Sequence, residues 1–138
     1  MNIDSILNGI VIDHIPAGAA MELYQLLSLD KLDCSVAIIK NAHSNKTGKK
    51  DIIKIDSAID LDFDLIGYIA PNASINIIRD GERIEKRAAT LPQRLTNVIT
   101  CQNPRCITAV EQELDQIFLL TDKDKKIYRC IYCETKAN

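Results

Sequence analysis

Two short stretches decide the fold of the C-terminal third of this chain, Cys101-Gln102-Asn103-Pro104-Arg105-Cys106 and Cys130-Ile131-Tyr132-Cys133. They form Cys-x4-Cys and Cys-x2-Cys pairs that residues 107–129 separate, which is typical of two thiolate pairs brought together by a hairpin. Asn103-Pro104 provides a tight turn that directs the first two sulfurs toward one point. Zn²⁺ takes four thiolates in a tetrahedron and needs no further donor, so the pattern predicts one structural zinc site without an open catalytic position.

Two disulfides and an iron ion are the alternative uses of these four thiols. We expect no secretory signal, because the N-terminus has no basic region before an apolar core, and paired cysteines in a cytosolic context favour a metal. Iron accepts the same ligand set, so the spacing leaves zinc and iron open. Cys34 precedes an apolar stretch and is expected to be a small buried side chain, not a fifth ligand.

The segment between the cysteine pairs predicts a β-hairpin. Asp122-Lys123-Asp124-Lys125 is a charged turn, and residues 117–121 and 126–130 on either side of it are expected to be strands. The module is therefore predicted to be a zinc-ribbon-like β domain. The apolar residues of this module are few and form only a small core. We therefore expect metal binding to supply part of the folding free energy of the module.

Length and composition indicate a globular protein of two small units. The chain has 138 residues, of which 46% are hydrophobic and 26% charged. Leu91-Pro92 ends the first unit, so we expect domains at 1–92 and 93–138, with a linker through Val98. The apolar runs are much shorter than a membrane span, which predicts a cytoplasmic protein without membrane contact.

Charge and motifs weigh against two classes of function. The net charge is −2, aromatic residues make up 4% and there is no Trp, whereas nucleic-acid binding usually needs a basic surface or stacking aromatics. We therefore expect no nucleic acid among the partners, and a zinc-ribbon nucleic-acid-binding protein remains the alternative function. The sequence contains no Gly-rich phosphate loop, Ser-His-Asp order or convincingly spaced carboxylate pair, so no catalytic site is predicted.

The N-terminal unit alternates strand and helix patterns. β-branched runs predict strands, and apolar residues three and four apart predict helices. In chain order the predicted elements are strand 9–15, helix 17–29, strand 36–40, strand 51–55, helix 59–66, strand 73–78 and, after Asp80-Gly81, the return strand 83–87. Residues 41–50, rich in Asn, Ser, Lys and Gly, are expected to form a loop. This order predicts an α+β, ferredoxin-like antiparallel sheet with two helices on one face and an added hairpin strand.

Alternation along a strand sorts the side chains of this sheet onto two faces. It places Val11, Asp13 and Ile15 on one face of the first strand, and Ile10, Ile12 and His14 on the other. In the third strand Lys50, Ile52 and Lys54 share a face, and in the fourth Asn76 and Ile78 do.

One face of the sheet would therefore gather Asp13, Lys50, Lys54 and Asn76. Lysines on that face, with Lys86 nearby, would neutralise a triphosphate, and Asp13 would accept hydrogen bonds from a ribose. The alternative is a polar face that is simply solvated, which sheet alternation also predicts. His14 has two readings as well, since a lone His at a strand end is usually a structural hydrogen-bonding residue.

Blocks of sequence in a fixed order resemble the regulatory chain family of aspartate carbamoyltransferase. The blocks cover nearly the whole length, and their order together with the cysteine spacing is specific. They are Gly9-Ile10-Val11-Ile12-Asp13-His14-Ile15-Pro16-Ala17, Lys50-Asp51-Ile52-Ile53-Lys54-Ile55, Ala70-Pro71-Asn72-Ala73-Ser74-Ile75-Asn76, Leu91-Pro92, Cys101-Gln102-Asn103-Pro104-Arg105-Cys106-Ile107-Thr108 and Tyr132-Cys133-Glu134.

The resemblance implies a non-catalytic regulatory subunit that controls pyrimidine biosynthesis. It implies an N-terminal allosteric domain that binds ATP and CTP, and a C-terminal zinc domain that docks on the catalytic chain. It also implies a regulatory dimer that bridges catalytic trimers. Carried over by position, the nucleotide-binding residues would be Ile3, Asp4, Ile6, Val11, Asp13, His14, Lys50, Lys54, Asn76, Ile78 and Lys86, and the metal ligands Cys101, Cys106, Cys130 and Cys133. Gly81 stands where the family commonly has an aromatic residue, and Arg83 takes a position that is usually apolar.

Overall fold

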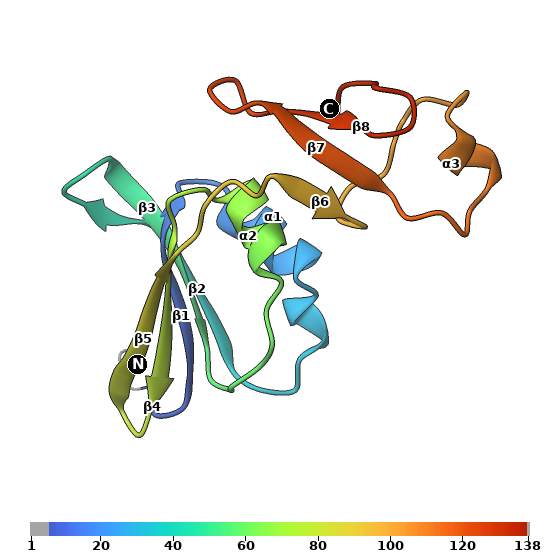
Figure 1. The fold of residues 1–138 in the computed structure, drawn as a ribbon. Helices are drawn as coiled ribbons and strands as arrows, with labels where there is room; N and C mark the ends of the chain where they lie inside the picture. The colour runs from blue at the N-terminus through green and yellow to red at the C-terminus, as the bar shows by residue number, and fades with distance from the viewer. Residues whose placement is uncertain (1–5, 138) are drawn as a thin grey trace. The chain divides into compact units, whose positions relative to one another are not determined.

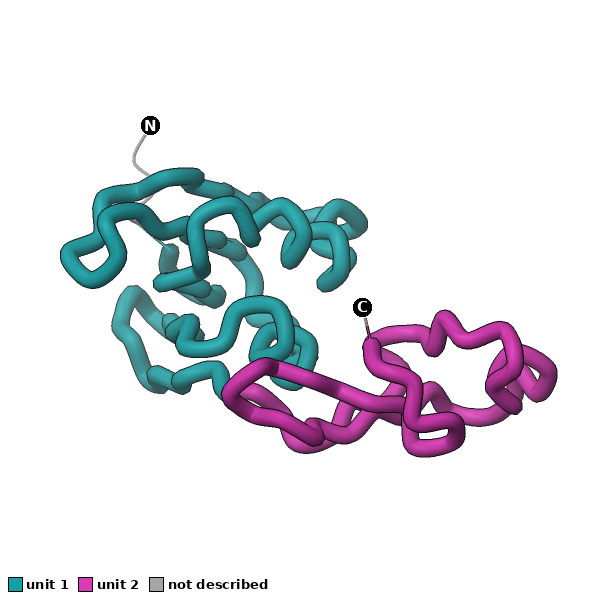
Figure 2. The backbone as a smooth tube through the Cα atoms, turned by 90° about the horizontal axis from the view of Figure 1, so that it is seen from above, with its two compact units in different colours: residues 1–90 teal, residues 91–138 magenta. Residues whose placement is uncertain are grey.

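The structure is a computed structural model that describes residues 6–137 (Figure 1). The chain forms two compact units, residues 1–90 and residues 91–138, drawn teal and magenta in Figure 2. Among the helices of the described residues, none combines the length and apolar character needed to cross a membrane.

The first unit holds five strands and two α-helices. In chain order its elements are β1 (Gly9–Pro16), α1 (Ala20–Leu26), a 3-10 helix (Leu29–Lys31), β2 (Val36–Ser44), β3 (Gly48–Ile55), α2 (Phe63–Ile69), β4 (Ser74–Arg79) and β5 (Glu82–Ala88). All neighbouring strands pair antiparallel in the order β2-β3-β1-β4-β5. The first four strands have the ferredoxin-like order, so the predicted α+β fold with an added hairpin strand is confirmed.

The core of this unit lies between one face of the sheet and the two helices (Figure 1). Ile12, Ile53 and Ile75 from three neighbouring strands are at most 1% exposed, and Leu23 of α1 and Ile66 of α2 are fully buried with them. Each of these Ile side chains contributes roughly 1.5–3 kcal/mol by leaving water. The helices cover this face, and the other face of the sheet carries the half-buried polar side chains.

Several predicted boundaries are wrong in the first unit. Residues 41–50 do not form a loop, because β2 extends to Ser44 and β3 begins at Gly48, leaving a turn over residues 45–47. The predicted helix 17–29 is a seven-residue helix followed by a separate 3-10 turn, with Ser28 in the left-handed region (φ 56°) between them. The predicted helix 59–66 starts later, at Phe63, because the Asp62 carboxylate accepts a hydrogen bond from the Leu65 N–H (3.1 Å) and caps α2 there.

A β-bulge in β1 overturns the predicted face of Ile15. The pairing of β1 with β3 shifts between Ile12 and Ile15, and His14 has a positive φ of 58°. The extra residue reverses the alternation, so Ile15 is fully buried in the core with Ile12 instead of lying on the face of Asp13. Strict alternation was therefore valid only before the bulge.

The second unit is a small β domain with a short helix. Its elements are β6 (Arg94–Thr96), α3 (Ile107–Val110), β7 (Ile117–Asp122) and β8 (Ile127–Cys130), and the strands form an antiparallel sheet in the order β6-β7-β8. The predicted hairpin across residues 122–125 is confirmed. The predicted linker through Val98 is wrong at β6, because Leu95 is fully buried and pairs with Phe118. Tyr128, 1% exposed, hydrogen-bonds through its hydroxyl to the Pro92 carbonyl and completes this core.

Candidate functional site

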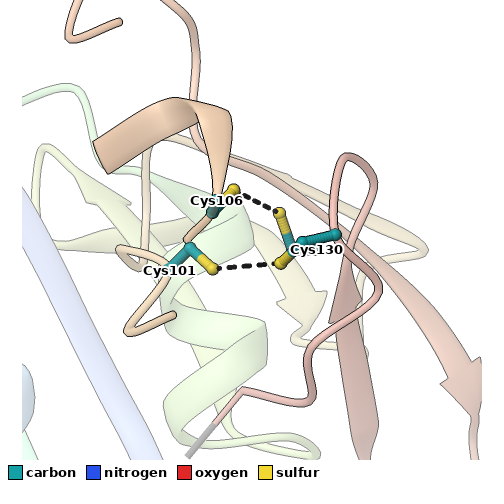
Figure 3. Close-up of side chains that lie close together, drawn as sticks. Cys101, Cys106 and Cys130 are labelled. Atoms are coloured by element: carbon teal, nitrogen blue, oxygen red, sulfur yellow. Dashed lines mark hydrogen bonds between the residues drawn. The ribbon is translucent and has the colours of Figure 1, made fainter. Parts of the chain in front are cut away.

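The four cysteines of the second unit converge on one point. Cys101 and Cys106 come from the loop before α3, Cys130 ends β8, and Cys133 lies in the turn that follows. Figure 3 shows the Cys106 sulfur facing the sulfur of Cys130. The Sγ–Sγ distance is 3.5 Å between Cys101 and Cys133 and 3.7 Å between Cys106 and Cys130, and all four sulfurs lie within 4.8 Å of one another.

This cluster fits a tetrahedral metal ion. A metal–sulfur bond of about 2.3 Å gives a tetrahedron with sulfur–sulfur edges of about 3.8 Å, close to the two distances above. Four sulfur donors without a carboxylate or imidazole favour a soft or borderline ion such as Zn²⁺. All four thiols are free of disulfides, and Cys34 lies outside the cluster. A metal at this point would hold residues 101–106 to the end of the β7–β8 hairpin.

Neighbouring hydroxyl and amide groups orient the sulfurs. The buried Thr108 hydroxyl donates to Cys106 Sγ (3.1 Å), and the Cys101 N–H donates to the Gln116 side-chain oxygen (3.0 Å). The Thr135 hydroxyl lies 3.2 Å from Cys133 Sγ and accepts a hydrogen bond from the Asn103 amide (3.2 Å). Such outer contacts position metal ligands and tune their basicity. The sequence pattern predicted the four cysteines of the cluster but none of these supporting groups.

The thiols differ in how readily they lose a proton in the metal-free protein. Burial, followed by the other cysteines of the cluster, raises the pKa of Cys101 to about 12. Burial also raises the pKa of Cys130. The Thr135 hydroxyl lowers the pKa of Cys133 to about 6, which makes this thiol the first to become a thiolate. A metal ion entering the cluster would therefore bind the Cys133 thiolate first and displace protons from the other cysteine thiols.

Metal uptake should release protons and weaken on acidification. At pH 7 Cys133 is largely ionised, so the protons displaced come from the other thiols; below pH 6 it holds its own proton and adds one more. We expect acidification of a weakly buffered solution when Zn²⁺ is added, and an apparent affinity that falls as the pH is lowered from 8 to 5. Cys34→Ser is the matched control and should leave the proton release unchanged. Uptake of the ion without proton release would contradict thiolate ligation.

On the open face of the first unit's sheet, four predicted site residues form one row across the strands. Val11 of β1 is paired with Lys54 of β3 on one side and Asn76 of β4 on the other, and Asn76 is paired with Lys86 of β5. Lys54, Val11 and Asn76 are half-buried, and Lys86 is exposed. The Asn76 amide donates to the Val11 carbonyl (3.2 Å), which fixes its side chain over the sheet. Two ammonium groups thus flank an amide and an apolar residue.

Asp13, His14 and Lys50 gather at the bulged end of β1. Lys50 Nζ lies 2.9 Å from Asp13 Oδ1, and the same oxygen accepts the His14 N–H at 2.6 Å. His14 Nε2 is 3.9 Å from the second carboxylate oxygen. Burial opposes ionisation of Asp13, but the Lys50 ammonium and the His14 N–H outweigh it and lower the pKa of this carboxyl. The cluster is therefore an ion pair of a carboxylate and an ammonium at neutral pH.

A pocket of about 480 Å³ opens beside this cluster. It lies between the end of β1, the β2–β3 turn and the turn before β4. Its walls include His14 and Lys50, and also residues that were not predicted, namely Ser44, Lys46, Thr47, Lys49, Pro71, Asn72 and Ser74. The sequence signal for these pocket residues was the polar composition of residues 41–50, in which Lys46 and Lys49 lie close to Lys50.

The remaining predicted nucleotide contacts lie at the other end of the sheet or outside the residues that the structure describes. Ile78 is paired with Gly9, and the Ile6 side chain lies next to Gly9 as well. A Cβ at Gly9 would stand 2.1 Å from the Ile55 carbonyl oxygen, so only glycine allows this close approach of strands. Leu7 lies beside Gly81, whose N–H donates to the Leu7 carbonyl (2.9 Å). Ile3 and Asp4 lie outside the residues that the structure describes.

Comparisons with known proteins agree over both units. The family model described as aspartate carbamoyltransferase regulatory chain, allosteric domain, matches residues 1–90, and the one described as its metal binding domain matches residues 93–138. Among curated relatives, the aspartate carbamoyltransferase regulatory chain of Bifidobacterium longum is 41% identical over 99% of both chains. The protein of the same name from Clostridium tetani is 47% identical over 97% of this chain and 94% of its own. This chain belongs to the family of aspartate carbamoyltransferase regulatory chains.

Proposed function

We propose that this chain binds ATP and CTP on the open face of its first unit and passes the signal to aspartate carbamoyltransferase catalytic chains, thereby controlling pyrimidine biosynthesis in the cytoplasm. The observation that carries the proposal is the row of Lys54, Val11, Asn76 and Lys86, which three antiparallel pairings align across four strands of the sheet. Lysine ammonium groups attract phosphate as point charges, and an amide and a carboxylate discriminate ribose and base by hydrogen bonds.

The site has a polar end and an apolar end, which suits a nucleoside triphosphate. Ile6 and Ile78, beside Gly9, offer apolar contact and backbone groups to a base. Lys54 and Lys86 lie in the middle row, and Lys50 lies at the bulged end with Asp13. The Lys50 ammonium already satisfies a carboxylate, so a phosphate arriving there would compete with Asp13, while Asp13 would turn toward a ribose hydroxyl. His14 borders the same pocket and would supply a further polar contact.

The second unit is proposed to hold Zn²⁺ and to dock on the catalytic chain. Three apolar side chains near the cysteines in the sequence face solvent in the isolated chain: Ile107 is 51% exposed, Val110 77% and Ile131 40%. Each lies within a few residues of a cysteine, so the metal would fix their relative positions. An exposed apolar patch next to a rigid centre is typical of a protein interface. The relatives are named regulatory chains of aspartate carbamoyltransferase, which supports a catalytic chain of that enzyme as the partner.

A second copy of the chain is proposed to pair through the first unit, as a regulatory dimer. Within the described residues, β2 and β5 are the edge strands of the sheet. The side chains of β5 are all exposed and mostly charged, which discourages pairing, whereas β2 begins with the half-buried apolar run Val36-Ala37-Ile38-Ile39. The β2 edge is therefore the side of the sheet better suited to a second chain.

Allosteric control requires that the nucleotide bind two states of the assembly with different affinity. A coupling free energy of about 1–3 kcal/mol is typical. Phosphate charges that release Lys50 from Asp13 would supply a contact that depends on the geometry of this end of the sheet. The transmission itself would run from the first unit to the catalytic chains through the second.

Mixing the purified, zinc-loaded chain with an aspartate carbamoyltransferase catalytic trimer tests the proposal. We expect a larger complex by native mass spectrometry, in which regulatory chains occur as dimers, and a change in catalytic activity on adding ATP or CTP. The metal-depleted chain is the control and should not assemble. An assembled complex whose catalytic activity is the same with and without ATP and CTP would contradict the effector role. Salt-sensitive binding of a DNA duplex by the free chain would favour the zinc-ribbon nucleic-acid-binding alternative.

A further inference from the structure

Both neighbours of β3 carry a β-bulge, and the two bulges face the same short stretch of β3. In β1, Asp13 and His14 stand opposite Ile52, and in β2 residues 40–41 stand opposite Asp51. Each bulge contains a residue with positive φ, His14 at 58° and Asn41 at 59°. Such bulges bend a strand and redirect its side chains. The β1 bulge borders the pocket that His14 and Lys50 line, and β2 continues from its own bulge to Ser44 in the wall of that pocket. Something in the fold must hold these two strained residues in place.

The carboxylate of Asp51 holds the bulge of β2. Asp51 is fully buried, and its Oδ1 accepts the N–H of Asn41 at 3.0 Å. Its other oxygen, Oδ2, accepts the N–H groups of Gly18 (2.9 Å) and Ala20 (3.2 Å) at the start of α1. One side chain of β3 therefore ties the β2 bulge to the β1–α1 turn. Pro16 and Ala17 of that turn line the pocket.

The neighbouring residue, Lys50, makes the equivalent connection on the opposite face of β3. Its ammonium binds Asp13, whose carboxylate accepts the His14 N–H in the β1 bulge. Asp51 and Asp13 thus each hold one bulge, one on the helix side of the sheet and one on the open side. Because residues 50 and 51 are consecutive, the backbone that Asp51 fixes also sets where the Lys50 ammonium lies.

We propose that Asp51 is a positioning residue of the nucleotide site, which it serves by locking the two walls of the pocket and the direction of Lys50. The proposal rests on the function proposed above. A carboxylate is required because it only accepts hydrogen bonds, and three N–H groups converge on it. An asparagine would point its NH₂ group at one or two of these donors and leave them without an acceptor.

The experiment compares Asp51→Asn and Asp51→Ala with Asp62→Ala in the full chain. Asp62 is the matched control, because its carboxylate also accepts a backbone N–H at the start of a helix but is not among the residues that line the pocket. At a temperature where all variants are folded, we expect the ATP dissociation constant of Asp51→Asn to rise about tenfold, the loss typical of a misplaced charged hydrogen bond. Asp62→Ala should lose thermal stability without changing that constant. Asp51→Asn carries the test if Asp51→Ala fails to fold.

Two further readouts separate this inference from the proposed function. Hydrogen exchange at the amides of Gly18 and Asn41 should accelerate in Asp51→Asn, and chemical acetylation of Lys50 should change relative to that of the exposed Lys31. If the wild-type chain binds no nucleotide, the proposed function fails, and the acetylation of Lys50 still decides the role of Asp51. An unchanged Lys50 acetylation rate in folded Asp51→Asn, or an unchanged ATP dissociation constant, would overturn the positioning role.

Discussion

Removing the metal from the cysteine cluster should unfold residues 91–138 and leave residues 1–90 folded. The second unit has a core built mainly from Leu95, Phe118 and Tyr128, and we expect a core of this size to be too small to be stable alone. Structural Zn²⁺ sites in small domains contribute roughly 10–16 kcal/mol at pH 7, more than such a core supplies. The first unit keeps its own core from Ile10 to Ala89 and needs no metal.

Hydrogen exchange read by mass spectrometry would measure this effect unit by unit. After treatment with a strong chelator, peptides from β7 and β8 should lose their protection, whereas peptides from β1 and β3 should keep theirs. Cys106→Ser should have the same effect without chelator, because Cys106 is buried and would supply one of the four ligands. Cys34→Ser is the control that should change neither unit. Both the chelated protein and Cys106→Ser should fail to join a catalytic trimer.

Continued protection of the second unit after metal removal would contradict this prediction. If β7 and β8 stay protected once the metal is gone, the hydrophobic contacts of Phe118 and Tyr128 hold the unit together and the cysteines have another role. A disulfide between Cys101 and Cys133 would also preserve the fold, since their sulfurs are 3.5 Å apart. Repeating the exchange under a thiol reductant distinguishes that case, because a reduced and metal-free unit should unfold.

Local patterns predicted the parts of the fold that depend on local chemistry. The cysteine spacing predicted a cluster that the structure brings together within 4.8 Å, because a turn at Asn103-Pro104 and a β-hairpin are both short-range features. The order of strands and helices in the first unit followed from apolar periodicity. Alternation also placed Lys50 and Lys54 correctly opposite the buried Asp51 and Ile53, because β3 itself carries no extra residue.

The misses have a common cause in contacts between distant segments. The bulge at His14 places Ile15 in the core. No pattern within residues 9–16 predicts this bulge, because it depends on the register of β1 against β3. The strand β6 lies within the predicted linker, because three residues make no periodic pattern and only the pairing of Leu95 with Phe118 defines the strand. No local pattern predicts the role of Asp51, because the three N–H groups whose hydrogen bonds it accepts belong to residues 10 to 33 positions away.

Lys54→Ala should abolish most of the response to ATP and CTP while leaving assembly and metal content intact. Lys54 lies on β3 at the open face, paired with Val11 on one side and Ala37 on the other. An ammonium–phosphate contact typically contributes about 1.5–3 kcal/mol, so its loss should raise both nucleotide dissociation constants roughly 10- to 150-fold. Isothermal titration calorimetry on the full chain measures this directly.

Conservative and remote variants make the Lys54 result interpretable. Lys54→Arg keeps the positive charge and should retain part of the affinity, whereas Lys31→Ala removes an exposed lysine from the 3-10 helix and should have no effect. The affinity of the wild-type chain should also fall as salt is raised, because the contact is between charges, and that salt dependence should be weaker in Lys54→Ala. Nucleotide binding by Lys54→Ala at wild-type strength would place the phosphates elsewhere on this chain. In that case the pocket that Lys46, Lys49 and Lys50 line is the next surface to mutate, because it holds the other group of ammonium side chains beside the ion pair of Asp13.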